Sequence, residues 1–134
     1  MSQAPAPEPR TTVLVVDDEE DLRDIMRRML ERRGFAALTA GDSQQAIAVC
    51  REYPGEIDIL VTDLGLPGVS GGELSRTAIE LRPGMRVVYI SGLPKDIAVA
   101  EGLIDAGALL VMKPFTTDLL IDALRSVLAE RAPS

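Results

Sequence analysis

The stretch TTVLVVDDE, residues 11–19, decides the fold prediction for this chain. A short run of apolar and β-branched residues is typical of a strand that is buried on both faces of a parallel sheet. Three acidic residues follow the run directly. Open parallel sheets bind their ligands outside the carboxyl ends of the strands, so Asp17 and Asp18 fall where such folds carry their chemistry.

The same pattern recurs further along the chain. We predict four more strands, at residues 35–39, 57–62, 85–90 and 108–112, of which the first is the weakest. Polar residues follow three of them: Asp63 after the third strand of the chain, Ser91 after the fourth and Lys113 after the fifth. The sequence therefore predicts an acidic cluster with a lysine at one edge of a sheet.

Segments with apolar residues at helical spacing separate these strands. Gly34 is predicted to end the first helix and Asp42 to cap the second. A third helix is predicted to stop at Pro83-Gly84, a fourth to continue through Ile104 to Gly107, and a fifth to begin near Thr116-Thr117.

This alternation of strands and helices predicts an α/β fold. With right-handed crossovers it gives a flavodoxin-like (βα)5 doubly wound parallel sheet, for which strand order 2-1-3-4-5 is the commonest arrangement. The switch point of that order lies between the first and third strands, which places Asp17 and Asp18 beside Asp63.

Length and composition limit the classes of function. The 134 residues fit one domain, predicted at residues 11–131, with a Pro/Ala-rich tail at residues 1–10 that we expect to be disordered and a short tail at 132–134. A net charge of −7 argues against a nucleic-acid surface. Without histidine and with Cys50 as the single cysteine, the chain has no disulfide framework, zinc site or histidine catalysis.

No signal peptide and no apolar stretch of ~18 residues is found, so we expect a cytoplasmic protein without a membrane partner.

Carboxylates held close together repel one another, and loss of solvent increases the repulsion. A crevice that contains Asp17, Asp18 and Asp63 therefore favours a hard divalent cation. Mg²⁺ prefers oxygen ligands and is commonly held by one or two carboxylates with phosphate completing its shell. The sequence predicts Mg²⁺ as the cofactor.

Four motifs taken together resemble the receiver domain of two-component response regulators. They are Asp17-Asp18, Asp63 followed by LGLPG, Ser91-Gly92 and Lys113-Pro114-Phe115, and the resemblance runs from about residue 12 to residue 131. It implies that Asp63 is a nucleophile that accepts a phosphoryl group from a histidine kinase or a phosphotransfer protein. It also implies that the chain is a phosphoacceptor signalling domain and catalyses only its own phosphorylation and slow dephosphorylation.

The resemblance assigns further roles by position. Asp18 and Asp63 are expected to ligate Mg²⁺ directly, Asp17 largely through water, and the carbonyl of Gly65 is expected to supply another oxygen. Ser91 and Lys113 are expected to contact phosphoryl oxygens. The Lys113-Pro114 bond is a candidate cis peptide.

One position departs from the family pattern. The family carries an aromatic residue three positions before its lysine, and this chain has Leu110 there. We therefore expect the movement of Ser91 to be transmitted by loop rearrangement alone, or to be coupled more weakly. The expected output surface is the face of the fourth helix, fifth strand and fifth helix, in a monomer or a weak phosphorylation-dependent dimer.

Several alternatives stay open. Because the sequence ends just past the fifth helix, we expect either a single-domain response regulator or a receiver module of a hybrid histidine kinase. The tail that opens at Met1 favours the single-domain regulator, and a phosphate sink is a further alternative. A phosphate-independent interaction module is an alternative of another class. A flavin mononucleotide carrier is disfavoured by Asp17-Asp18, which would repel its phosphate. A magnesium-dependent phosphatase is disfavoured because no second acid stands two residues after Asp63.

Overall fold

A computed structural model describes residues 10–131 of the chain. It has one parallel sheet with strand order β2-β1-β3-β4-β5, so the predicted flavodoxin-like fold is confirmed. The strands are β1 (Thr12–Val16), β2 (Ala36–Ala40), β3 (Ile59–Asp63), β4 (Arg86–Ser91) and β5 (Leu109–Met112). The two predicted tails lie outside the described residues, apart from Arg10.

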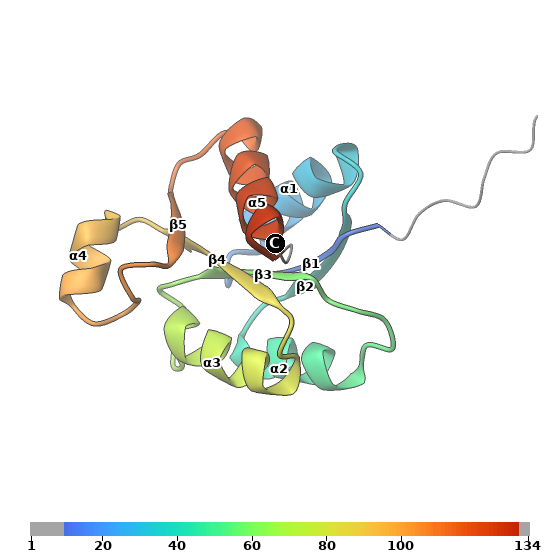
Figure 1. The fold of residues 1–134 in the computed structure, drawn as a ribbon, viewed down its shortest axis with the longest axis horizontal. Coiled ribbons are helices and arrows are strands. Elements are labelled where there is room, and N and C mark those ends of the chain that lie inside the picture. The colour runs from blue at the N-terminus through green and yellow to red at the C-terminus, as the bar shows by residue number, and fades with distance from the viewer. Residues whose placement is uncertain (1–9, 132–134) are drawn as a thin grey trace, which may run out of the picture.

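Five helices connect the strands and cover both faces of the sheet (Figure 1). They are α1 (Glu20–Arg32), α2 (Ser43–Glu52), α3 (Gly71–Leu81), α4 (Lys95–Ala100) and α5 (Thr117–Arg131). Helices α1 and α5 lie on one face, α2 and α3 lie on the other, and α4 lies beyond the β5 edge (Figure 1). Between residues 10 and 131, none of the helices has the length and apolar character needed to cross a membrane.

The central strands explain the apolar runs of the sequence. Every residue of β1 and of β3 is buried, because helices cover both faces of the sheet. Val13 and Val15 face the core under α1 and α5, whereas Leu14 and Val16 face the core under α2 and α3. The alternation of side chains along a strand thus divides one apolar segment between two cores.

Two predicted helix signals are confirmed at the level of individual hydrogen bonds. Gly34 has a φ of 90° after α1, and the amide of Phe35 donates to the carbonyl of Leu30 over 3.0 Å, as in a Schellman motif. The Oδ1 atom of Asp42 accepts from the amide of Gln45 over 2.8 Å and caps α2.

The prediction for the fourth helix was wrong in its length. Helix α4 has only six residues and ends at Ala100, because Gly102 has a φ of 76° and forms the terminating motif. The amide of Leu103 donates to the carbonyl of Ala98 over 3.0 Å. Leu103 and Ile104 therefore lie in a loop rather than in the helix, and they pack in a small core between α4 and the sheet.

Candidate metal centre at the strand ends

The strand order brings the predicted acidic residues together. Val16 at the end of β1 is paired with Thr62 of β3, so Asp17 and Asp63, the next residues on each strand, are neighbours. One carboxylate oxygen from each of Asp17, Asp18 and Asp63 lies within 4.8 Å of the other two. Asp17 and Asp63 are buried, whereas Asp18 is exposed to solvent.

Hydrogen bonds hold both the side chain and the backbone of Asp17. Its Oδ1 atom accepts from the amide of Glu19 over 2.8 Å, and its carbonyl oxygen accepts from Nη1 of Arg23 over 2.8 Å. Its Oδ2 atom is buried and has no hydrogen-bond partner among the described residues. A buried carboxylate oxygen without a hydrogen-bond donor is a position that a cation can complete.

Asp63 lies between a backbone donor and a lysine. Its Oδ1 atom accepts from the amide of Gly65 over 2.9 Å, and its Oδ2 atom accepts from Nζ of Lys113 over 2.8 Å. The same Nζ lies 3.4 Å from Oδ2 of Asp17 and 4.0 Å from Oε1 of Glu19. The Lys113-Pro114 peptide bond is cis, as predicted from the sequence.

Burial and charge shift the pKa values of two groups in this cluster. Burial raises the pKa of Asp17 above the ordinary aspartate range, although the amide of Glu19 and the charge of Lys113 oppose the shift. Burial lowers the pKa of Lys113. The hydrogen bond to Asp63 and the negative charges of Asp63 and Asp17 raise it by more, so the net shift is upward. The site thus strongly favours a cation, while its buried carboxylate is costly to ionise without one.

The donor set fits Mg²⁺. All candidate ligands are hard oxygen atoms, the three carboxylates converge, and the buried Oδ2 atom of Asp17 accepts no hydrogen bond from the described residues. The turn at Leu64 and Gly65 follows Asp63 directly, and the amide of Gly65 contacts the Asp63 carboxylate. The residues present here are therefore compatible with Mg²⁺.

Ser91 and Leu110 lie at the neighbouring strand ends. Ser91 is buried at the end of β4, and its Oγ atom accepts from the amide of Leu93 over 2.8 Å. Its carbonyl accepts from the amide of Lys113 over 2.8 Å, which ties the ends of β4 and β5 together. Leu110 is paired with Tyr89 of β4 and packs against the small core that contains that tyrosine.

Two contacts at the site were not predicted. Glu19 was not assigned a role at the site, and its carboxylate lies at the edge of the Lys113 cluster. Arg23 was not assigned a role, and it holds the carbonyl of Asp17. The sequence contained a signal for both contacts. Glu19 follows Asp18 directly, and Arg23 lies one turn into the helix that begins beside the acids, so both side chains are near the cluster.

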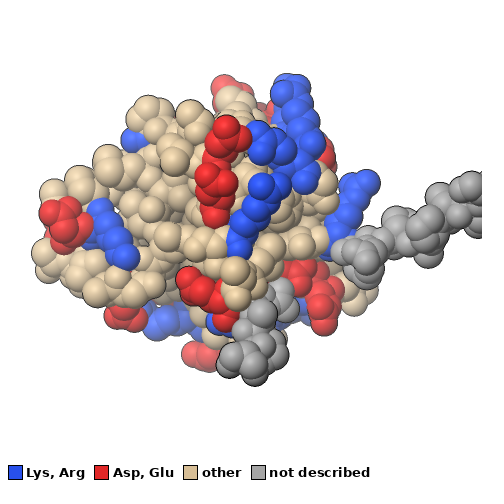
Figure 2. Space-filling model, turned by 45° about the horizontal axis from the view of Figure 1, so that its top comes forward, with Lys and Arg blue, Asp and Glu red and all other residues tan. Residues whose placement is uncertain are grey.

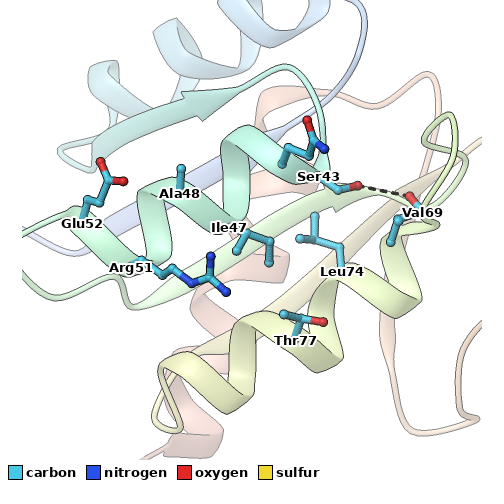
Figure 3. Close-up of a pocket in the computed structure, with 9 residues that line it drawn as sticks. Ser43, Ile47, Ala48, Arg51, Glu52, Val69, Leu74 and Thr77 are labelled. Atoms are coloured by element: carbon cyan, nitrogen blue, oxygen red, sulfur yellow. Dashed lines mark hydrogen bonds between the residues drawn. The ribbon is translucent and has the colours of Figure 1, made fainter.

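A separate pocket of 340 Å³ lies between α2 and α3 (Figure 3). Ile47, Val69 and Leu74 supply apolar lining, and the hydroxyl of Ser43 donates to the carbonyl of Val69 over 3.3 Å at one end (Figure 3). None of the residues that line it belongs to the acidic cluster. The residues predicted from the sequence to carry chemistry therefore lie at the strand ends and not in this pocket.

On the side of α1 and α5, positive and negative side chains lie next to one another (Figure 2). Arg27 pairs with Glu31 over 2.9 Å, Arg28 with Asp24 over 3.0 Å, and Arg33 with Asp118 over 2.7 Å. These arginines are thus largely neutralised by acids of the same surface.

The fold and the site define a class of protein: a doubly wound α/β domain with an acidic crevice and a lysine at the carboxyl ends of parallel strands. A family model described as the response regulator receiver domain matches residues 13–125. The chain belongs to this family.

Comparison with individual proteins agrees with this assignment. The chain is 34% identical over 124 residues to the C4-dicarboxylate transport transcriptional regulatory protein DctD of Pseudomonas aeruginosa, and the match covers 91% of the chain and 26% of that protein. It is 29% identical to the sensor kinase CckA of Brucella abortus, over 90% of the chain and 13% of the kinase. A receiver protein from Sinorhizobium medicae has a structure with a TM-score of 0.79 at 30% identity, over 92% of this chain and 98% of that one. The chain thus corresponds to a minor part of the two longer proteins and to nearly all of the third.

Proposed function

We propose that this chain accepts a phosphoryl group on Asp63 in a Mg²⁺-dependent reaction, with a histidine kinase or a phosphotransfer protein as the donor. The observation that carries the proposal is the position of the Asp63 carboxylate, which lies within 4.8 Å of two other acids and 2.8 Å from Lys113. A nucleophilic carboxylate beside a lysine and a divalent-cation site has the parts that phosphoryl transfer requires.

In the proposed reaction a carboxylate oxygen of Asp63 attacks the phosphorus atom. The new O–P bond forms as the bond between phosphorus and the donor atom breaks, and the leaving group keeps that electron pair. The amide of Gly65 and the ammonium of Lys113 hold the two carboxylate oxygens of Asp63 before attack. Mg²⁺, when bound by Asp18, Asp63 and the Gly65 carbonyl with Asp17 acting through water, supplies charge neutralisation for the phosphoryl oxygens.

Lys113 and Ser91 would bind the transferred group. The ammonium of Lys113 already lies against Asp63 and can move to a phosphoryl oxygen once the carboxylate is phosphorylated. The hydroxyl of Ser91 accepts from the amide of Leu93, so its own proton is free to be donated to another phosphoryl oxygen. We assign both residues to the stabilisation of the phosphorylated state.

For the output we propose a cytoplasmic single-domain response regulator that acts through protein contacts, as a monomer or a weak phosphorylation-dependent dimer. The face of α4, β5 and α5 supports a protein partner, because Ile97, Met112 and Leu119 are exposed there. The match to the sensor kinase CckA favours the alternative of a receiver module from a hybrid histidine kinase. A phosphate sink uses the same chemistry at Asp63.

Intact mass measurement tests the proposal. The protein is incubated with acetyl phosphate and Mg²⁺, in parallel with Asp63→Asn and with the control Asp122→Asn, which changes an exposed aspartate on α5. We expect one added phosphoryl group in the wild type and in the control, none in Asp63→Asn and none with excess chelator. An unmodified wild type, under conditions that modify another receiver domain, would support a phosphate-independent interaction module instead.

A further inference from the structure

A buried tyrosine connects the strand of Ser91 to helix α3. Tyr89 lies on β4 two residues before Ser91, so both side chains leave the same face of the strand. Its hydroxyl lies 2.6 Å from Oγ of Ser75, and both residues are buried. No sequence motif of the site includes this pair.

The direction of this contact follows from the proton count. The hydroxyl of Ser75 donates to the carbonyl of Gly72 over 2.8 Å, and a hydroxyl has only one proton to donate. Tyr89 is therefore the donor to Ser75. The three groups form a directed hydrogen-bond chain from Tyr89 to Ser75 to Gly72, which we call the Tyr89 chain.

The Tyr89 chain ends on a turn of α3 that lies directly against the phosphoacceptor and the α4–β5 loop. A Cβ atom added at Gly71 would overlap the carbonyl oxygen of Asp63. One added at Gly72 would lie 2.5 Å from the carbonyl oxygen of Leu103. Backbone therefore packs on backbone at both glycines, and displacement of any one of these segments requires movement of the others.

The ring of Tyr89 lies where this chain lacks the family's aromatic residue. Tyr89 is the cross-strand partner of Leu110, the position at which the family pattern has an aromatic side chain. Its ring packs in the small core with Leu64, Ala98 of α4 and Ile104, and Leu110 packs against the same core. An aromatic side chain from β4 thus packs against Ala98 of α4, beside the leucine that β5 has at position 110.

We propose that Tyr89 is a positioning residue that couples phosphorylation of Asp63 to the α3–α4 surface, in place of an aromatic residue at position 110. This inference rests on the proposed function of Asp63. When the hydroxyl of Ser91 turns to a phosphoryl oxygen, it releases the amide of Leu93 and frees the loop that leads into α4. Ala98 of α4 packs in the core of Tyr89, so movement of α4 changes the surroundings of the tyrosine ring and the hydrogen bond to Ser75.

The composition of the chain makes this testable by fluorescence. The chain has two tyrosines and no tryptophan. Tyr53→Phe therefore leaves Tyr89 as the only emitting side chain, and Tyr89→Phe leaves only Tyr53, which is packed elsewhere, against the core under α2. Tyrosine emission is recorded before and after incubation with acetyl phosphate and Mg²⁺, and intact mass is measured on the same samples.

We expect the emission of Tyr53→Phe to change as the phosphorylated mass appears, and that of Tyr89→Phe to stay constant while the same mass appears. In the NMR spectrum, Tyr89→Phe and Ser75→Ala should each lose the phosphorylation-dependent amide shifts of residues 73–81 in α3 but keep those of residues 95–100 and those next to residue 63. The inference is overturned if Tyr53→Phe is phosphorylated with unchanged emission, or if the shifts of residues 73–81 survive in both variants. If no phosphorylated mass appears in the wild type, the proposed function itself fails.

Discussion

Replacement of Asp17 by asparagine should stabilise the metal-free protein. Its Oδ2 atom lies 3.4 Å from the ammonium of Lys113, an attraction of about 5 kcal/mol at an effective dielectric constant of about 20. The carboxylate of Asp63, within 4.8 Å, opposes this with at least about 3.5 kcal/mol at the same dielectric constant, and Asp18 adds to the repulsion. The charge terms nearly cancel, so the desolvation of a fully buried carboxylate decides the sign.

Desolvation makes the ionised Asp17 a net cost, in agreement with its raised pKa. In Asp17→Asn the amide group keeps an acceptor for the amide of Glu19 and removes the orphaned anionic oxygen. We expect a gain of about 1–2 kcal/mol in the free energy of unfolding, within the range for an unsatisfied buried polar group. Urea denaturation in excess chelator measures it, with the exposed Asp122→Asn as the control.

The pH dependence of this gain has a definite sign. The folded-state pKa of Asp17 lies above its unfolded value, so the folded protein holds its proton more tightly. The wild type therefore loses stability as the pH rises from the unfolded pKa through the folded pKa, and the asparagine variant does not. The difference in free energy of unfolding between Asp17→Asn and the wild type should be small in acid and should increase toward neutral pH.

Addition of Mg²⁺ should reverse the order of the two proteins. At a concentration a hundred times the dissociation constant, bound Mg²⁺ adds about 2.7 kcal/mol to the wild type, which exceeds the gain of the variant. Asp17→Asn should lose most of this increment. The reasoning is refuted if the variant in chelator is no more stable than the wild type, or if it keeps the full response to Mg²⁺.

Three further predictions concern the supports of the site and the core. Gly71→Ala should cost about 1–3 kcal/mol in urea denaturation, because the new Cβ overlaps the Asp63 carbonyl. Gly84→Ala, where the Cβ lies in open space, should stay within about 0.5 kcal/mol of the wild type. Equal free energies of unfolding for the two variants would contradict the contact. Arg82→Ala should cost about 2–3 kcal/mol in thermal unfolding, because its three hydrogen bonds to carbonyls at and just after the end of α2 are lost. Arg82→Lys should recover less than half of this loss. Full recovery by lysine would show that charge alone matters. Burial raises the pKa of the Cys50 thiol, so a thiol reagent at pH about 8 should label it only as the protein unfolds; rapid labelling of the native protein would contradict its burial.

The sheet and the acidic cluster could be predicted because each depends on a strong local pattern. The strand after residue 11 is buried on both faces and is therefore apolar throughout, and its end is marked by Asp17 and Asp18. Parallel strand order then places Asp63 beside them without further information. Gly34 was assigned correctly because α1 has only one glycine near its end.

The end of α4 could not be predicted for the opposite reason. Gly102 and Gly107 both follow apolar residues at helical spacing, and only the packing of Leu103 and Ile104 into the core beside Tyr89 selects Gly102. The bond between Tyr89 and Ser75 was missed because it joins side chains from β4 and α3 that no motif relates. Interactions of this kind depend on how α3 lies against the sheet.

Chemical localisation of the phosphoryl group tests the central claim most directly. Borohydride reduces an acyl phosphate to an alcohol, so treatment of the phosphorylated protein should convert the modified aspartate to homoserine, which peptide mass spectrometry can locate. We expect homoserine at position 63 only, and only in samples that received both Mg²⁺ and acetyl phosphate. Homoserine at another acid of the cluster, such as Asp18, or a phosphoryl group that resists borohydride on a hydroxyl such as that of Ser91, would contradict the assignment of Asp63 as the acceptor.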